Sequence, residues 1–134
     1  MTAIVLDASV AVKIVSEEQD SDAAVRRVAY AGSVIAPDWM VLETAHALWK
    51  KVQAEQFDQS AAEAGIAALP QIVDRFVSSM SLMPMALPLS YQLPHSLYDC
   101  LYLALAQSEG LVLLTADRGC LRLQQPQALR AMWN

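Results

Sequence analysis

The chain has few of the residues that usually indicate thiol, zinc or nucleophile chemistry. Among its 134 residues there are only 2 cysteines and 2 histidines. Cys100 and Cys120 lack the spacing of a zinc motif, and neither His46 nor His95 stands near a serine or cysteine in a recognisable nucleophile motif. We therefore expect no zinc site and no covalent protein nucleophile.

Positive charge is also scarce. The chain carries 9 lysines and arginines against 14 aspartates and glutamates, for a net charge of −5. Because lysine and arginine contacts to phosphates supply most of the affinity for nucleic acid, this balance argues against passive electrostatic binding of RNA or DNA. A nucleic-acid substrate would need a bound cation to offset the negative charge locally.

Long apolar runs and targeting segments are missing as well. A long uncharged stretch, residues 77–98, is interrupted by Pro84, Pro88 and Pro94, so we expect no membrane span. The first residues, MTAIVLDAS, have no basic flank before the apolar run, and we predict no secretory signal and a cytoplasmic protein. Repeats, low-complexity blocks and linkers are absent, so residues 1–134 are expected to form a single domain.

Short apolar runs alternate with helical patterns along the chain. The apolar runs predict strands at residues 3–6, 33–36, 82–87, 111–115 and 128–133, with the third at an edge because it contains Pro84. Helices are expected at residues 11–15, 21–30, 38–54, 58–80 with an interruption at Pro70, and 96–109. This alternation predicts an α/β fold, a three-layer α/β/α sandwich with a parallel sheet of four to five strands.

Two details of the helices can be predicted from side chains. Ser9 is placed to cap the first helix, and Asp38 is a natural cap for the helix over residues 38–54. In that helix an apolar stripe is formed by Leu42, Ala45, Trp49 and Val52.

Four acids, Asp7, Glu43, Asp99 and Asp117, lie at the ends of apolar runs or inside helices that are otherwise almost uncharged. A carboxylate in such surroundings is costly unless something positive offsets it. If the strands are parallel, Asp7 and Asp117 both follow carboxyl ends, and open α/β sheets bind ligands at that edge. The pattern therefore favours a cluster of acids that holds a divalent cation.

Each acid also has a purely structural explanation. Asp99 lies three residues after Ser96, which is the spacing of a capping box, and the helix dipole favours an acid there. Asp7 and Asp117 could each cap the helix that follows them. Glu43 could be an ordinary exposed helix residue. Taken together the four acids favour the cluster, because four independent accidents would otherwise be needed.

Other polar residues near the acids are open to two interpretations. Lys13 and Arg118 could contact phosphates or be plain surface, and His95, ahead of the Asp99 helix, could face a substrate or simply pack. The acids of the polar segments, including Glu18, are expected to be solvated surface.

Four segments follow one another along the chain: LDASV, a glutamate in the helix after the second strand, YDCLYLALA and LLTAD. In these segments and in their order the chain resembles the PIN-domain family, most closely its VapC-type toxin branch. The resemblance spans nearly the whole chain and implies a Mg²⁺- or Mn²⁺-dependent ribonuclease that acts on RNA and has a cognate antitoxin protein. The residues that it implies as metal-binding and catalytic are Asp7, Glu43, Asp99 and Asp117, with Ser9 and Thr115 as secondary site residues. The chain departs from the pattern at His46, where many relatives carry asparagine, and in a connector at residues 86–96 that is shorter than the usual helical segment.

The chemistry of carboxylates agrees with this implication. Gathered acids raise each other's pKa values, and a hard cation such as Mg²⁺ relieves the repulsion and retains several waters of its own. One or two such ions can activate a water and stabilise the leaving oxygen of a phosphodiester.

Alternative functions are a solitary PIN nuclease in RNA processing, a non-cleaving domain that binds RNA or a partner, and a phosphoacceptor receiver domain. A receiver would need an adjacent acid pair after the first strand, and a non-cleaving domain would be expected to lack one of the four acids; neither condition is met. The apolar content of 55%, with Trp39 and Trp49 on short elements, exceeds what one small core needs and favours a homodimer or a partner peptide in a groove.

Overall fold

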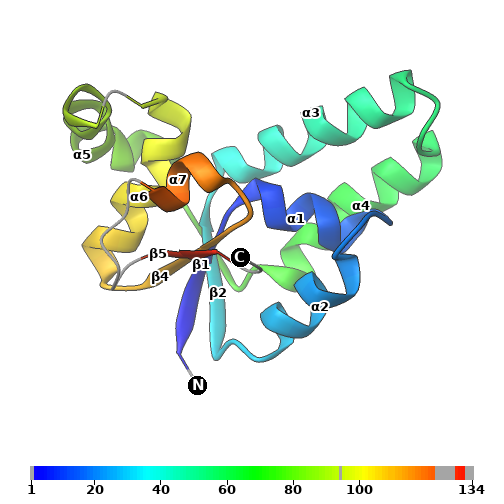
Figure 1. The fold of residues 1–134 in the computed structure, drawn as a ribbon, viewed down its shortest axis with the longest axis horizontal. Coiled ribbons are helices and arrows are strands. Elements are labelled where there is room, and N and C mark those ends of the chain that lie inside the picture. Colours follow the sequence, from blue (N-terminus) through cyan, green and yellow to red (C-terminus); the bar gives the residue numbers. More distant parts are fainter. Residues whose placement is uncertain (1, 94, 123–128, 132–134) are drawn as a thin grey trace.

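Helices and strands alternate along most of the chain in a computed structural model that describes residues 2–93, 95–122 and 129–131 (Figure 1). The strands are β1 Ala3–Leu6, β2 Ser33–Pro37, β3 Arg75–Val77, β4 Val112–Thr115 and β5 Leu129–Ala131. The helices are α1 Ala8–Val15, α2 Ser21–Ala29, α3 Trp39–Gln53, α4 Gln59–Ile72, α5 Ser79–Gln92, α6 Leu97–Glu109 and α7 Arg118–Arg122. Within these described ranges, no helix is long and apolar enough to cross a membrane.

The strands form one five-stranded sheet in the order β3-β2-β1-β4-β5, and every neighbouring pair is parallel. Figure 1 shows α1 and α2 on one side of this sheet and α5 and α6 on the other. The predicted α/β sandwich with a parallel sheet is therefore confirmed. Of the last predicted strand, Leu129–Ala131 form β5, and residues 128, 132 and 133 lie outside the described residues.

The core is centred on β1, β4 and α6. Val5, Leu6, Leu113 and Leu114 are fully buried in the two central strands. α6 packs across this centre, and its residues 100–106 are all buried. A helix that is apolar on every side is typical of such a buried position. Asp99 lies just ahead of this buried run, at the amino-terminal end of the helix.

The prediction of the third strand at residues 82–87 is wrong. These residues lie in α5, where the buried Leu82 and Ala86 are spaced four apart along one face that packs against α6. Pro84 and Pro88 lie inside the helix at exposed positions. Each proline removes one backbone hydrogen bond, but the carbonyls that are freed at an exposed surface can bind water, so packing on α6 decides the conformation.

The helix predicted over residues 58–80 is wrong at its carboxyl end. α4 continues through Pro70 without an interruption and ends at Ile72, after which the chain forms β3. A three-residue strand is too short for its apolar period to be recognised, and its pairing with β2 determines it. Because α5 runs to Gln92, most of the connector at residues 86–96 is helical.

Only part of the apolar stripe predicted for α3 faces the core, where Val52 packs against Leu48 and Ala62. Leu42 and Trp49 are 61% and 56% exposed, whereas Met40, Thr44 and Leu48 are buried. The Thr44 hydroxyl donates to the Met40 sulfur at 3.3 Å, which satisfies a polar group on the buried face. Because Thr44 is polar, the sequence pattern does not identify this face of α3 as the buried one.

Ser9 does not cap α1, contrary to the prediction. The helix begins at Ala8, and Asp7 occupies the N-cap position without a capping hydrogen bond from its side chain. The Ser9 hydroxyl instead donates to the Asp7 carboxylate at 2.7 Å. The capping explanation for Asp7 is therefore wrong as well, and its carboxylate serves another purpose.

Candidate metal centre

The parallel sheet brings Asp7 and Asp117 to the same edge. β1 and β4 are neighbours with Leu6 aligned to Leu114, and the Asp7 amide continues the ladder by donating to the Leu114 carbonyl at 3.1 Å. Asp7 follows β1 directly, and Asp117 follows the end of β4. Both carboxylates therefore lie at the carboxyl ends of the central strands, where open α/β sheets bind ligands.

Helices α3 and α6 add Glu43 and Asp99 to this edge. Glu43 lies in the first half of α3, and Asp99 lies in the first turn of α6. A cavity of about 170 Å³ is lined by Asp7, Ala8, Ser9, Val12, Glu43, Ala47, Asp99 and Asp117. The structure thus brings together all four predicted acids and Ser9, and Thr115 is buried in contact with Asp7.

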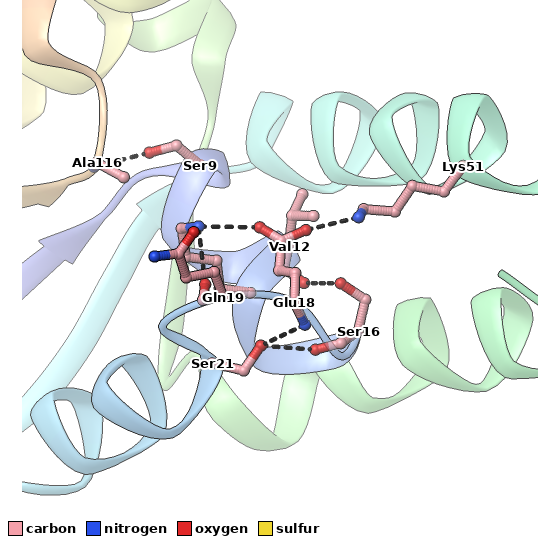
Figure 2. A network of polar contacts seen from close by, with 9 residues as sticks. Ser9, Val12, Ser16, Glu18, Gln19, Ser21, Lys51 and Ala116 are labelled. Atoms are coloured by element: carbon pink, nitrogen blue, oxygen red, sulfur yellow. Dashed lines mark hydrogen bonds and ion pairs between the residues drawn. The ribbon is translucent and has the colours of Figure 1, made fainter. Parts of the chain in front are cut away.

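Two hydroxyls fix the carboxylate of Asp7, which is only 4% exposed. Ser9 Oγ and Thr115 Oγ1 both donate to Asp7 Oδ2, at 2.7 and 2.6 Å. Ser9 Oγ also accepts from the Ala116 amide at 3.0 Å, as Figure 2 shows, so it joins α1 to the end of β4. Thr115 Oγ1 accepts from the Asp117 amide at 3.0 Å. These bonds tie the two acids of the sheet edge to one polar network.

Glu43 is held from the core side by a tyrosine. The hydroxyl of the fully buried Tyr102 donates to Glu43 Oε1 at 2.7 Å. The rings of Trp39 and Tyr98 stack at 4.3 Å between centroids and 10° between planes, which joins the start of α3 to the start of α6. Glu43 is half-buried and hydrogen-bonded, so the interpretation as an ordinary exposed helix residue is wrong.

Asp99 and Asp117 combine structural roles with their place in the cavity. Ser96 Oγ accepts from the Asp99 amide at 3.2 Å, so the predicted cap of α6 forms, while Asp99 Oδ2 pairs with His95 Nε2 at 2.9 Å. Asp117 Oδ1 accepts from the Gly119 amide at 2.8 Å at the start of α7. Asp117 can therefore cap α7 and line the cavity at the same time, because the hydrogen bond from Gly119 uses only one of its two carboxylate oxygens.

Negative charge accumulates in this cavity, and of its acids Asp99 pairs with His95. Burial raises the pKa of Asp7 from 3.8 to about 6, although hydrogen bonds from Thr115 and Ser9 act in the opposite direction. Burial also raises the pKa values of Glu43 and Asp99, and repulsion between Asp99 and Asp117 adds to the second shift. Among the described residues, no lysine or arginine lines the cavity.

Two lysines near the cavity pair with Glu18. Lys13 Nζ and Lys51 Nζ contact the Glu18 carboxylate at 3.0 and 2.6 Å, and Figure 2 shows Lys51 reaching Glu18. Glu18 is therefore a half-buried ion-pair partner, and its prediction as solvated surface is wrong. His46 stacks on Trp49 at 5.5 Å between ring centroids, and its neighbour Trp49 lines a different cavity.

The donor set of the acid cavity suits a hard divalent cation. Its charged side chains offer carboxylate oxygens only, and Mg²⁺ and Mn²⁺ prefer such ligands. A bound cation would also remove the repulsion that raises the pKa values of the acids. Asp7, Glu43, Asp99 and Asp117 could therefore hold Mg²⁺ or Mn²⁺.

The sequence over residues 4–125 matches the PIN domain family, and this match covers all four acids. The chain belongs to the PIN-domain family. The PIN domain is 35% identical over 85 residues to Ribonuclease VapC1 of Mycobacterium tuberculosis, in strains CDC 1551 / Oshkosh and ATCC 25618 / H37Rv. This alignment covers 61% of the chain and 61% of the length of VapC1.

Solved structures share the fold of this PIN domain. PAE2754 from Pyrobaculum aerophilum has a TM-score of 0.74 at 21% identity, over 98% of this chain and 91% of that one. VapC20 from Mycobacterium tuberculosis, a toxin that cleaves the sarcin-ricin loop, has a TM-score of 0.73 at 17% identity, over 93% and 98%. VapBC2 from Rickettsia felis, bound to a DNA fragment from its promoter, has a TM-score of 0.67 at 12% identity, over 99% and 100%.

Sequence reasoning missed two residues of this PIN domain that matter at the site. Tyr102 supports Glu43, and its position three residues after Asp99, on the same face of a helix, was the available signal. Cys120 lies against His95, with 4.0 Å between Sγ and Nε2, and burial together with the surrounding acids raises the pKa of its thiol. No local spacing indicated that contact, because 25 residues separate the two side chains.

Proposed function

We propose that this PIN domain is a divalent-metal-dependent endoribonuclease of the cytoplasm, acting as the toxin of a toxin–antitoxin pair. The observation that carries the proposal is the convergence of Asp7, Glu43, Asp99 and Asp117 in one cavity without a cationic side chain among its described lining residues. The naming of the relative VapC1 as a ribonuclease supports the same activity. The four acids hold Mg²⁺ or Mn²⁺ and serve as the catalytic residues, with Ser9 and Thr115 as positioning residues.

The side chains around the acids orient them for this task. Ser9 and Thr115 hold Oδ2 of Asp7, and Tyr102 holds Oε1 of Glu43. The Gly119 amide holds Oδ1 of Asp117 in the same way. Each of these bonds occupies one oxygen of a carboxylate and restricts its rotation, so the second oxygen is presented to a ligand. Partners of this kind typically alter metal affinity or activity by about 10–100-fold when they are removed.

The proposed reaction is hydrolysis of an RNA phosphodiester bond. When bound, the cation lowers the pKa of water and stabilises negative charge on the phosphate oxygens. Water supplies the hydroxyl that joins phosphorus, the bond from phosphorus to the leaving ribose oxygen breaks, and that oxygen departs with a proton. The chain's own acids position the cation and offset its charge, and Asp7, whose pKa is raised to about 6, loses its proton when it acts as a ligand.

The proposed protein partner is an antitoxin polypeptide, and a second copy of the chain is expected to form a homodimer. The VapBC2 assembly, with a similar fold, supports an antitoxin partner. A groove of about 510 Å³ between α3 and α4 offers an apolar surface, lined by Ala45, Leu48, Trp49, Val52, Gln53, Gln59, Ala62, Glu63 and Ile66. Trp49, 56% exposed, would become covered in such a complex.

The activity is tested by incubating the purified chain with total tRNA and ribosomal RNA in Mn²⁺, in Mg²⁺ and in EDTA, and by mapping new 5′ ends. We expect cleavage at defined sites with either cation and none in EDTA. Asp117→Asn should lower the rate by at least roughly 100-fold, since losing a ligand should cost no less than losing a residue that supports one.

Asp22→Asn is the matched control, because Asp22 is an exposed acid of α2 outside the cavity. Its cleavage rate should equal that of the unsubstituted chain. Site-specific cleavage that persists in EDTA, or at full rate in Asp117→Asn, would contradict the proposal.

A further inference from the structure

A second group of potential metal ligands borders the acid cavity and differs from it in chemistry. It consists of His95, Asp99, Asp117 and Cys120, whose ligand atoms all lie within 4.8 Å of one another. Asp99 and Asp117 belong to both groups, whereas His95 and Cys120 are absent from the acid cavity. The second group therefore adds a nitrogen and a sulfur donor to two shared carboxylates.

The distances in this group are close to those of a tetrahedral zinc site. His95 Nε2 lies 2.9 Å from Asp99 Oδ2 and 4.0 Å from Cys120 Sγ. Zn–N bonds of about 2.0–2.1 Å and a Zn–S bond of about 2.3 Å at a tetrahedral angle place nitrogen and sulfur about 3.6 Å apart. Because all four ligand atoms lie within 4.8 Å of one another, side-chain shifts of up to about an ångström would complete a tetrahedral site.

The backbone at Gly119 permits this approach. A Cβ at Gly119 would crowd Asp117 Oδ1 at 3.1 Å and would reach ordinary contact with His95 Cε1 at 3.5 Å, so a larger residue would push against Asp117. Asp99 and Asp117 also line the acid cavity, and the side chains of His95 and Asp99 retain 25% and 20% exposure while Cys120 is 1% exposed.

We propose that His95, Asp99, Asp117 and Cys120 form a binding site for a thiophilic divalent cation such as Zn²⁺, and that its occupancy inhibits the nuclease. Nitrogen and sulfur donors select Zn²⁺ or Co²⁺, whereas a set of carboxylates alone suits Mg²⁺ and Mn²⁺. Inhibition follows because Zn²⁺ would draw Asp99 and Asp117 away from the hard cation. This inhibition rests on the proposed ribonuclease function, whereas the binding of Zn²⁺ does not.

Co²⁺ tests the site without any measurement of activity, because a thiolate bound to tetrahedral Co²⁺ gives a charge-transfer band in the near ultraviolet and intense visible bands. The reduced chain, free of a histidine tag, is titrated with Co²⁺, and Zn²⁺ is then added. We expect both sets of bands to grow to one equivalent and to disappear as Zn²⁺ displaces Co²⁺.

Three variants assign the ligands. Cys120→Ser and His95→Gln should each abolish the charge-transfer band or weaken Co²⁺ binding at least about 10-fold. Cys100→Ala is the matched control, since Cys100 is a buried thiol of the same chain outside the group, and it should keep the bands. Circular dichroism verifies that each variant is folded, and His95→Gln, at a partly exposed position, carries the test if Cys120→Ser fails to fold.

Absence of a charge-transfer band in the unsubstituted chain, or its persistence in Cys120→Ser, would overturn the proposal of the site. For inhibition, micromolar Zn²⁺ is added to reactions with excess Mn²⁺, and Cys120→Ser should need at least about 10-fold more Zn²⁺ for half inhibition. Equal inhibition of both proteins would overturn the inhibitory role. Failure of Mn²⁺-dependent cleavage itself would contradict the proposed function and would leave the Co²⁺ result standing.

Discussion

Asp7 and Glu18 lie at opposite ends of the short helix α1, and their electrostatic surroundings are opposite. Burial raises the pKa of Asp7, which has acids as its charged neighbours. Burial also acts to raise the pKa of Glu18, but hydrogen bonds and attraction from Lys51 and Lys13 reverse the effect and lower it. The fold therefore places two lysines beside the half-buried Glu18, whereas the cavity gathers four acids with no lysine or arginine among its described lining residues. This is the arrangement expected of a cation-binding site.

The largest difference between the two acids should be seen in activity. Asp7→Asn should lower RNA cleavage by at least roughly 100-fold while the folded state without metal becomes more stable, because an amide oxygen can still accept from Ser9 and Thr115 without the cost of burying a charge. Glu18→Gln should do the reverse, with little effect on cleavage and a loss of stability. Cleavage rates and urea unfolding of both variants measure this, and equal changes in the two would contradict the assignment.

The two acids should also differ in the sign of their pH dependence. The folded pKa of Asp7 is raised, so its contribution to stability is full below pH 3.8 and is lost as the pH rises to about 6. At 1.36 kcal/mol per unit, this loss amounts to about 3 kcal/mol. The contribution of Glu18 has the opposite sign, because its lowered pKa gives stability above the unfolded value of 4.5 that is lost as the pH falls.

Urea unfolding between pH 4 and pH 7 in EDTA measures this dependence. Asp7→Asn should remove most of the loss of stability that accompanies the rise in pH, and Glu18→Gln should leave that loss unchanged. A loss of the same size in Asp7→Asn and in the unsubstituted chain would show that another group is responsible.

Glu43 is the next test, because it is held by Tyr102 and also lines the cavity. Mn²⁺ at about 100 times its dissociation constant should stabilise the unsubstituted chain by about 2.7 kcal/mol. Glu43→Gln should bind Mn²⁺ more weakly, as measured by calorimetric titration and by the shift in Tm, and should be at least as stable as the unsubstituted chain in EDTA. Indistinguishable Mn²⁺ affinity together with unchanged cleavage would exclude Glu43 from the metal site.

The smallest effect is expected at the ion pairs of Glu18. Lys51→Met removes one of its two lysine partners, and we expect a loss of about 0.5–1 kcal/mol, as is usual for partly exposed pairs. The response of Tm to Mn²⁺ should be unchanged, because Lys51 does not line the acid cavity. A reduced Mn²⁺ response in Lys51→Met would indicate that the two regions are coupled through α1.

The sheet and the acids could be predicted from the sequence because they depend on strong local signals. Buried runs such as residues 111–115 are continuous and apolar, and an acid at the end of such a run is conspicuous. The third strand could not be predicted, because β3 has three residues and its conformation depends on pairing with β2. The prolines within residues 82–88 argued against a helix there, but these residues form part of α5 because packing against α6 outweighs the loss of backbone hydrogen bonds.

The hydrogen bonds that support the cavity acids could not be predicted from the sequence for a different reason. Thr115 is 108 residues from Asp7 and Tyr102 is 59 residues from Glu43, so their hydrogen bonds exist only after the fold has formed. The Lys13–Glu18–Lys51 cluster depends in the same way on the packing of α1 against α3. Spacing along the chain can indicate which residues share a face, but it cannot indicate which faces meet.

Anomalous X-ray diffraction from crystals grown with Mn²⁺ would test most directly whether the cavity acids hold a cation. We expect an anomalous peak in the cavity, within bonding distance of carboxylate oxygens of Asp7 and Asp117, and no peak at Glu18, which already has two lysine partners. A cavity that contains no peak at saturating Mn²⁺, while the crystal binds Mn²⁺ elsewhere, would contradict the metal site and the nuclease function that depends on it.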